Sequence, residues 1–206
     1  DSGMIANYFE SQNALTKEEC ELLIREGKVN MNDSLVYSIS HSDGSSDEII
    51  NKKSRSSKTA IYENDSSDEV KKVLDKVADI FREIAFYYFR FPLCSIESPQ
   101  FVHYVEGDFF SWHTDCAPKS DNPNEFIDRD LSASVILSSK SDYEYGGLEF
   151  AVPDSINVFN IQRIKEEQGK IIVFHSNMNH RVSSIFGKER SSLVLWGSRN
   201  YGGKNI

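Results

Sequence analysis

The chain is poor in cysteine and contains no long apolar run. Its 206 residues include only Cys20, Cys94 and Cys116, which lie far apart and form no CxxC pair. This usage argues against a disulfide framework or a thiolate zinc site and favours a reducing compartment, so we expect a cytoplasmic location. No apolar stretch approaches the roughly 20 residues that a membrane-spanning helix needs. The first ten residues have neither a basic nor an apolar segment, so we expect that a secretory signal is absent or has already been removed.

Positive charge is also scarce. The chain has 23 lysines and arginines against 32 acidic residues, which gives a formal net charge of -9. An acidic surface disfavours non-specific binding to nucleic acids and to anionic membranes. We therefore expect no membrane partner and regard a nucleic acid as a disfavoured partner. The sequence does not indicate an oligomeric state.

Two helices are expected in the first half of the chain. Residues 16–27 (TKEECELLIREG) begin with Thr16 and Glu19 in capping-box spacing, and Gly27 can end the helix. Residues 68–90 carry apolar side chains at intervals of three and four, which predicts an amphipathic helix. Its apolar face must pack on something, and a sheet is the expected partner.

Two polar segments have no such periodicity. Residues 39–58 are rich in serine and predict a long surface loop, with a lid over a binding site as the alternative. Residues 153–168 (PDSINVFNIQRIKEEQ) are read either as one wall of a site or as a surface excursion. A further polar segment, residues 116–130 (CAPKSDNPNEFIDRD), is expected to flank the mouth of the site together with residues 39–58, and these two are compatible with contact to an extended peptide.

The second half of the chain predicts β structure. Short segments rich in β-branched and aromatic residues follow Pro92 and are separated by turn residues. They read PQFVHYV, FFSWHTD, LSASVILS, LEFAV, KIIVFHS, HRVSSI and SSLVLWGS. No helix is expected between them, which indicates an antiparallel sandwich or barrel. The fold class is therefore α+β, with helical support and a lid-like loop over residues 1–92 and the β core over residues 93–206.

The stretch FSWHTDCAP, residues 110–118, contains the first chemical signal. Residues two apart in a strand share a face and lie about 6.6 Å apart. His113 and Asp115 can therefore converge on one metal ion, and imidazole with carboxylate suits Fe(II). Trp112 and Cys116 alternate with them and should face away, so we expect Trp112 to pack and Cys116 to be a buried, inert thiol.

A third metal ligand must come from elsewhere, and His175 and His180 in FHSNMNHRV are the candidates. We favour His180 because Arg190 follows it ten residues later. On a strand, Arg190, Ser192, Val194 and Trp196 would share one face. Arg190 would then point inward alongside otherwise apolar neighbours, where its charge needs an anionic partner. Trp196 is read as a core residue, with the pocket floor as the alternative. No acidic residue in the nearby strands is an obvious mate, so a ligand carboxylate is the expected one.

These features in this order resemble a known family, the Fe(II)/2-oxoglutarate dioxygenases of the prolyl 4-hydroxylase-like branch. The resemblance rests first on His113 and Asp115, which form an HxD motif, and on the pair His180 and Arg190. Four further segments support it: LTKEECELLI, the RxS segment in RSSKTAIY (residues 55–62), Tyr104 and Gly107 ahead of HxD, and GGLEF. It covers roughly residues 8–200. It implies a double-stranded β-helix, or jelly roll, of about eight antiparallel strands with supporting N-terminal helices, forming a single dioxygenase domain.

The resemblance also implies cofactors and residue roles. Fe(II), 2-oxoglutarate and O2 are expected, with ascorbate as a reductant. The implied iron ligands are His113, Asp115 and His180. Arg190 would pair with the C5 carboxylate of 2-oxoglutarate, and Tyr104 would line its pocket. Some relatives have a further tyrosine near the position of Ile136, so we expect Tyr104 or Ser192 to provide the second hydrogen bond.

The implied activity is hydroxylation of an unactivated C–H bond, with release of succinate and CO2. We expect the substrate to be a prolyl or other residue of a protein or peptide. A free amino acid or another small molecule is the alternative substrate, and a nucleic-acid demethylase of the same superfamily is a further alternative. A jelly-roll binding module with a vestigial metal site would be the non-enzymatic alternative.

Overall fold

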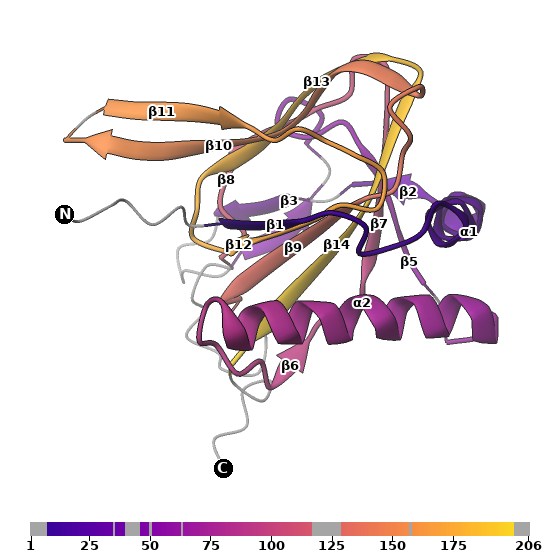
Figure 1. The fold of residues 1–206 in the computed structure, drawn as a ribbon. Coiled ribbons are helices and arrows are strands. Elements are labelled where there is room, and N and C mark those ends of the chain that lie inside the picture. Colours follow the sequence, from indigo (N-terminus) through magenta and orange to yellow (C-terminus); the bar gives the residue numbers. More distant parts are fainter. Residues whose placement is uncertain are drawn as a thin grey trace.

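The structure, a computed structural model, has three layers: a small sheet, a large sheet and a helical layer (Figure 1). It describes residues 8–34, 36–39, 46–49, 51–62, 64–116, 129–156 and 158–199. Every strand pair described is antiparallel. The two larger sheets face each other and form the jelly roll, so the predicted α+β fold class is confirmed. No helix among the described residues is long and apolar enough to cross a membrane.

The strands of the described chain fall into three sheets. The eight-stranded sheet has the order β1-β12-β9-β14-β7-β5-β2, with β6 paired to β14. Its strands are β1 (Tyr8–Ser11), β2 (Asn32–Asp33), β5 (Lys58–Ile61), β6 (Ser95–Ile96), β7 (Gln100–Val105), β9 (Leu131–Ile136), β12 (Ile171–His175) and β14 (Glu189–Ser198). The four-stranded sheet has the order β11-β10-β13-β8, with β8 (Phe110–His113), β10 (Tyr143–Ser155), β11 (Val158–Arg163) and β13 (His180–Gly187). A two-stranded sheet pairs β3 (Val36–Ile39) with β4 (Ser46–Ile49).

The first helix, α1 (Lys17–Gly27), forms where the sequence predicts it. Thr16 and Glu19 make both hydrogen bonds of the capping box. The helix ends at Gly27, and the chain continues directly into a 3-10 turn, η1 (Lys28–Asn30). A Cβ atom on Gly27 would lie 2.4 Å from the ring of Phe101. Glycine is therefore needed there for close packing of the helix against β7.

The second helix, α2 (Asp68–Tyr87), lies across the face of the large sheet opposite the small sheet (Figure 1). The Ser67 hydroxyl caps it by accepting a hydrogen bond from the backbone N–H of Val70. Its buried residues recur every three or four positions, at Val70, Val73, Val77, Phe81 and Ala85. They join the sheet in the main hydrophobic core. The helix ends three residues earlier than predicted.

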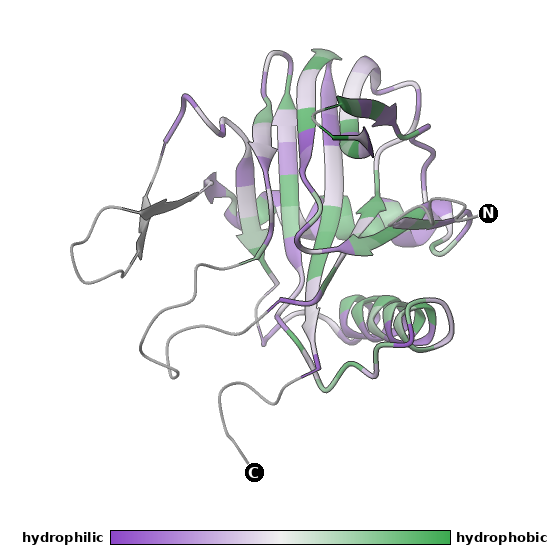
Figure 2. Cartoon of the chain, turned by 90° about the vertical axis from the view of Figure 1, so that its left-hand side faces the viewer, coloured by the Kyte–Doolittle hydropathy of each residue, from purple (hydrophilic) through white to green (hydrophobic). Residues whose placement is uncertain are grey.

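Alternation along the central strands separates this core from a pocket between the two sheets. On β14, Leu193 and Leu195 pack with the helices, whereas Arg190, Ser192, Val194 and Trp196 line the pocket. The predicted shared face of those four residues is thus confirmed. Figure 2 shows hydrophobic and hydrophilic residues along the strands as green and purple bands.

The N-terminal part of the chain differs from the expectation for residues 1–92. It contributes β1, β2 and β5 to the large sheet, as well as the two helices. These strands are only two to four residues long, so their sequences contain too little alternation to predict them.

The two polar segments also contain strands that the sequence analysis missed. Within 39–58, residues 46–49 form β4, while residues 40–45 and 50 lie outside the described residues. Residues 153–168 were read as a wall or an excursion, but most of them form the β10–β11 hairpin. Every residue of β11 is exposed, which explains its polar sequence. The site-flanking segment predicted at residues 116–130 lies mostly outside the described residues, because residues 117–128 are not among them.

Candidate metal centre

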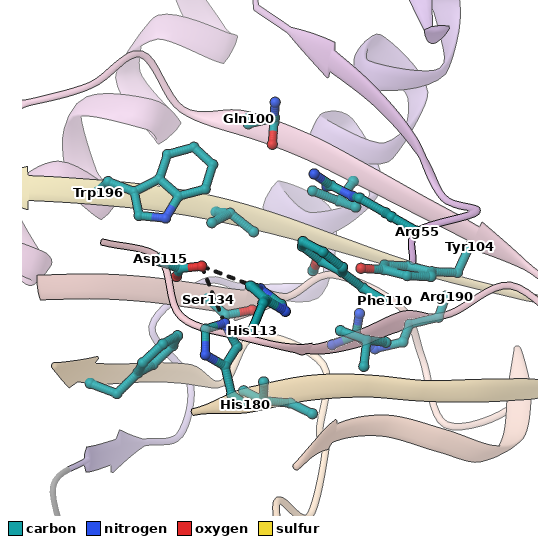
Figure 3. Close-up of a pocket in the computed structure, with 16 residues that line it drawn as sticks. Arg55, Gln100, Tyr104, Phe110, His113, Asp115, Ser134, His180, Arg190 and Trp196 are labelled. Atoms are coloured by element: carbon teal, nitrogen blue, oxygen red, sulfur yellow. Dashed lines mark ion pairs between the residues drawn. The ribbon is translucent and has the colours of Figure 1, made fainter. Parts of the chain in front are cut away.

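The three predicted ligands come together at one end of the small sheet (Figure 3). His113 ends β8, and His180 begins β13 directly opposite it in the antiparallel register. Asp115 follows β8 by two residues. One ligand atom from each residue lies within 4.8 Å of the other two. Strand pairing therefore creates the cluster from segments that are remote in sequence.

Hydrogen bonds fix which nitrogen of each imidazole faces the centre. The Nδ1 atom of His113 lies 2.7 Å from the carbonyl oxygen of Ser111, and Nδ1 of His180 lies 2.8 Å from that of Met178. A carbonyl only accepts, so each Nδ1 carries the proton and donates it. Each Nε2 therefore faces the centre, where it lies 3.3 Å from Oδ1 of Asp115 and can bind a metal ion once it has lost its proton. A hydrogen bond from the opposite ring nitrogen to a backbone carbonyl is the usual way in which metal-binding histidines are oriented.

The carboxylate of Asp115 is buried and ionised. Its Oδ2 accepts a hydrogen bond of 2.7 Å from the Ser132 hydroxyl. Burial by itself would raise its pKa, but the neighbouring His180 and His113 outweigh this and hold the pKa well below the usual value. Two imidazole nitrogens and one carboxylate oxygen around one point match the donor set of a non-haem Fe(II) site that keeps open positions.

His175, the alternative third ligand, is not part of the cluster. It ends β12, where its ring contacts Phe89 and Phe91 edge-on at centroid distances of 5.1 and 5.4 Å. The preference for His180 is thus supported by placement.

Arg190 is fully buried in the pocket wall, but its surroundings overturn one part of the sequence analysis. We expected no acidic mate within the protein. Instead, Glu166 forms two hydrogen bonds with it, from Nε to Oε1 (2.7 Å) and from Nη2 to Oε2 (2.8 Å). Glu166 lies in the loop between β11 and β12, inside the segment read as a wall or a surface excursion. The tertiary fold alone brings it to Arg190.

One nitrogen of Arg190 remains available. Nη1 is buried and has no hydrogen-bond partner in the described structure. A buried unsatisfied donor is costly and points to a missing acceptor. Tyr104 and Ser192 line the same pocket, and the guanidinium carbon lies 5.3 Å from the Tyr104 ring centroid. The pocket therefore fits a co-substrate that chelates the metal at one end and carries a carboxylate at the other.

Arg55 also lines the pocket, a position that the sequence did not reveal. Its guanidinium carbon lies 4.4 Å from the Phe110 ring centroid, and Phe110 stacks on His113 at 3.5 Å. Its Nε donates to the Ser57 hydroxyl over 2.9 Å. Arg55 stands in a serine-rich stretch whose polarity suggests exposure, and only its position in RxS gave a signal.

The remaining tryptophan and cysteine predictions have mixed outcomes. Trp112 faces away from the metal cluster and packs beneath the Arg181 guanidinium at 4.7 Å. Trp196 lines the pocket. The expectation of a buried Cys116 is wrong, because this residue is exposed just beyond the end of β8.

Residues 99–198 match the family model of the 2OG-Fe(II) oxygenase superfamily. This chain contains a 2OG-Fe(II) oxygenase domain. The matched range includes His113, Asp115, His180 and Arg190. The family resemblance drawn from the sequence is thus confirmed, and the family implies Fe(II), 2-oxoglutarate and O2 as cofactor and co-substrates.

Curated relatives of the oxygenase domain include PKHD-type hydroxylases. Those of Shewanella baltica and Shewanella oneidensis are 32% and 33% identical over 98 residues. Each match covers 48% of this chain and 41% of the relative, so the chain matches less than half the length of these relatives.

Solved structures with a similar fold include prolyl hydroxylases. A Pseudomonas putida prolyl-4-hydroxylase aligns over 95% of this chain and 94% of its own, with a TM-score of 0.67 and 18% identity. A Trichoplax adhaerens prolyl hydroxylase in complex with a hypoxia inducible factor peptide fragment aligns over 93% and 83%, with a TM-score of 0.62 and 17% identity. At these identities the likeness shows a shared fold.

Proposed function

We propose that this chain is an Fe(II)/2-oxoglutarate-dependent dioxygenase that hydroxylates a C–H bond in a protein or peptide, with a prolyl residue as the first candidate. One observation carries the proposal. The metal-binding atoms of His113, Asp115 and His180 converge in the pocket where a buried guanidinium nitrogen of Arg190 has no acceptor among the described residues. We further propose that residues 1–206 form one domain, since α1 and α2 pack on the sheet that contains β14 and β1 is a strand of that same sheet.

Each residue has a distinct task in this proposal. His113, Asp115 and His180 would hold Fe(II) and leave coordination positions free. With 2-oxoglutarate and O2 bound, Fe(II) would supply the oxidative chemistry that converts a substrate C–H bond to C–OH while 2-oxoglutarate becomes succinate and CO2. Arg190 holds the distal carboxylate and thereby fixes the orientation of the co-substrate. Tyr104 and Ser192 are the candidates for the second hydrogen bond.

The pocket walls exclude water from this chemistry. Phe110, Leu148 and Phe174 line it, and Leu148 and Phe174 belong wholly to the buried interior. A dry site strengthens the charge interactions of Arg190 and protects reactive species from side reactions.

The protein or peptide substrate is supported by the surroundings of the site. The Trichoplax structure of similar fold was solved with a peptide fragment. Trp196, Gln100 and Arg55 also line the pocket and can offer apolar and hydrogen-bonding contacts to a peptide. The net charge of -9 weighs against a nucleic-acid substrate. If the substrate is instead a free amino acid or another small molecule, the screen described below would detect it.

The test begins with succinate formation from 2-oxoglutarate in the presence of Fe(II) and O2. The wild-type protein should form succinate slowly even without substrate, and His180→Ala should abolish this. His175→Ala is the matched control, because His175 lies outside the cluster, and it should retain the activity. A peptide library is then screened for a mass increase of one oxygen atom, in parallel with free amino acids. Succinate formation that survives His180→Ala would refute the proposal.

A further inference from the structure

Glu166 determines how Arg190 presents itself to the pocket. Two of the three guanidinium nitrogens, Nε and Nη2, are bound to this carboxylate. Nη1 is the nitrogen left for a ligand. We infer that Glu166 is a positioning residue: it holds Arg190 from one side so that a single amino group is directed to the distal carboxylate of the co-substrate. This inference rests on the proposed function, in which Arg190 binds that carboxylate.

Glu166 is itself fixed by a complete set of donors. Besides the two bonds from Arg190, its Oε1 accepts a hydrogen bond of 2.5 Å from the Tyr143 hydroxyl. Its Oε2 accepts one of 2.9 Å from the backbone N–H of Leu148. An ionised carboxylate offers about four acceptor sites, and four donors surround this one. A glutamine in its place would turn an amide NH2 toward two donors, so only the carboxylate satisfies the site.

The fold provides space for this carboxylate at one glycine. Gly147 has a φ of +132°, and a Cβ atom there would lie 2.6–2.7 Å from the carboxyl atoms of Glu166. The loop that carries Glu166 is held nearby, because the backbone N–H of Ile164 donates to the carbonyl of Leu148 over 3.0 Å. The second glycine of GGLEF therefore admits the acid that holds Arg190.

This arrangement affects which ligands the pocket selects. An arginine side chain loses rotamer freedom when it binds a ligand, and a partner that already holds it reduces that loss. Glu166 also compensates the charge of Arg190, so attraction to a second carboxylate depends on the directed Nη1 group more than on net charge. The pocket should therefore favour a 2-oxo acid whose distal carboxylate reaches Nη1 over one that lacks this carboxylate.

The test compares two ligands that share the chelating end. The protein is loaded with Mn(II), and the dissociation constants of 2-oxoglutarate and pyruvate are measured by calorimetry without turnover. Wild type should bind 2-oxoglutarate more tightly than pyruvate, which has no distal carboxylate. Glu166→Gln should weaken 2-oxoglutarate binding about 10- to 100-fold, the range expected for one misdirected charge-assisted hydrogen bond, and leave pyruvate binding unchanged.

Glu149→Gln is the matched control. Glu149 also has little exposed surface, and it is bound by Arg163 and Arg181 on the four-stranded sheet, away from the pocket lining. This variant should lower the melting temperature and leave the preference for 2-oxoglutarate over pyruvate intact. Tyr143→Phe is a milder variant that removes one hydrogen bond from Glu166 and keeps the charge pair. It should weaken 2-oxoglutarate binding by a few fold only, consistent with one hydrogen bond.

The outcomes separate this inference from the proposed function. Suppose that Arg190→Met removes the preference for 2-oxoglutarate over pyruvate. If Glu166→Gln keeps this preference, or weakens the binding of both ligands equally, Glu166 is not a positioning residue and the proposed function stands. If Arg190→Met itself keeps the preference, the proposed role of Arg190 fails. Should Glu166→Gln not fold, an unchanged affinity in Tyr143→Phe overturns the inference.

Discussion

Replacing Ser132 by alanine tests how the carboxylate of the metal centre is directed. The Ser132 hydroxyl lies 2.7 Å from Oδ2 of Asp115 and 2.9 Å from the hydroxyl of Ser176. An ionised carboxylate can only accept, so Ser132 donates its single hydrogen to Asp115 and must accept one from Ser176. The resulting chain holds Oδ2 and leaves Oδ1 facing the two imidazoles. Without it, the carboxylate is free to rotate away from the metal position.

The expected loss of metal affinity follows from the types of hydrogen bond that link Ser176, Ser132 and Asp115. A hydrogen bond to a charged group contributes about 1.5–3 kcal/mol, and one between neutral groups about 0.5–1.5 kcal/mol. We therefore expect Ser132→Ala to weaken metal binding about 10- to 100-fold, which is also typical for outer-shell partners of metal ligands. Ser176→Ala should cost only about 2- to 10-fold. The assay is an anaerobic titration with Fe(II), or with Mn(II), against a competing chromogenic chelator.

Ser191→Ala is the control for loss of a buried serine. Its hydroxyl bonds Nδ1 of His103 over 2.8 Å and does not line the pocket. The variant should lose stability and keep its metal affinity. Unchanged metal affinity in Ser132→Ala, or a larger loss in Ser176→Ala than in Ser132→Ala, would refute the reasoning.

Three further predictions concern the scaffold. Phe81→Ala should lower the free energy of unfolding by about 3–5 kcal/mol in urea titrations, because its ring is fully buried, whereas the half-exposed Phe86 should tolerate alanine with little change. Burial opposes ionisation of Glu149, but Arg181 and Arg163 outweigh it and lower the pKa of its carboxyl group in the folded protein. The ionised carboxylate therefore stabilises the fold above the unfolded pKa of about 4.3, and this stabilisation is lost as the pH falls through the lower folded pKa. The difference in unfolding free energy between wild type and Glu149→Gln should accordingly shrink in acid. Burial raises the pKa of Cys20 to about 12, so at pH 8 iodoacetamide should label the exposed Cys116 and spare Cys20 until urea unfolds the chain, as peptide mass spectrometry would show.

Features encoded over short distances in the sequence were predicted well. The capping box of Thr16 and Glu19 and the apolar stripe of α2 are local patterns, because a helix repeats every 3.6 residues. Strand alternation placed His113 and Asp115 together and put Arg190, Ser192 and Trp196 on one face. The imidazole and carboxylate groups then indicated a metal centre, and the inward-facing Arg190 indicated a ligand that carries a carboxylate.

The partners of those side chains could not be predicted in the same way. Glu166 was read as part of a polar excursion, and no local pattern reveals that it faces Arg190, 24 residues along the chain. Ser132 reaches Asp115 only because β9 lies in the sheet that faces β8. The short strands β1, β2 and β5 join the large sheet through backbone pairing, which cannot be predicted from so few residues.

The sequence by itself thus determined the kinds of groups that the site contains, through residue chemistry and the periods of helix and strand. The tertiary structure alone decided which of these groups are buried and which atoms they turn to one another. It also decided that Nη1 of Arg190 is the guanidinium nitrogen with no partner in the described part of the chain. The physical reason is that burial and hydrogen bonding depend on contacts between remote segments, and these exist only once the two sheets have closed on each other.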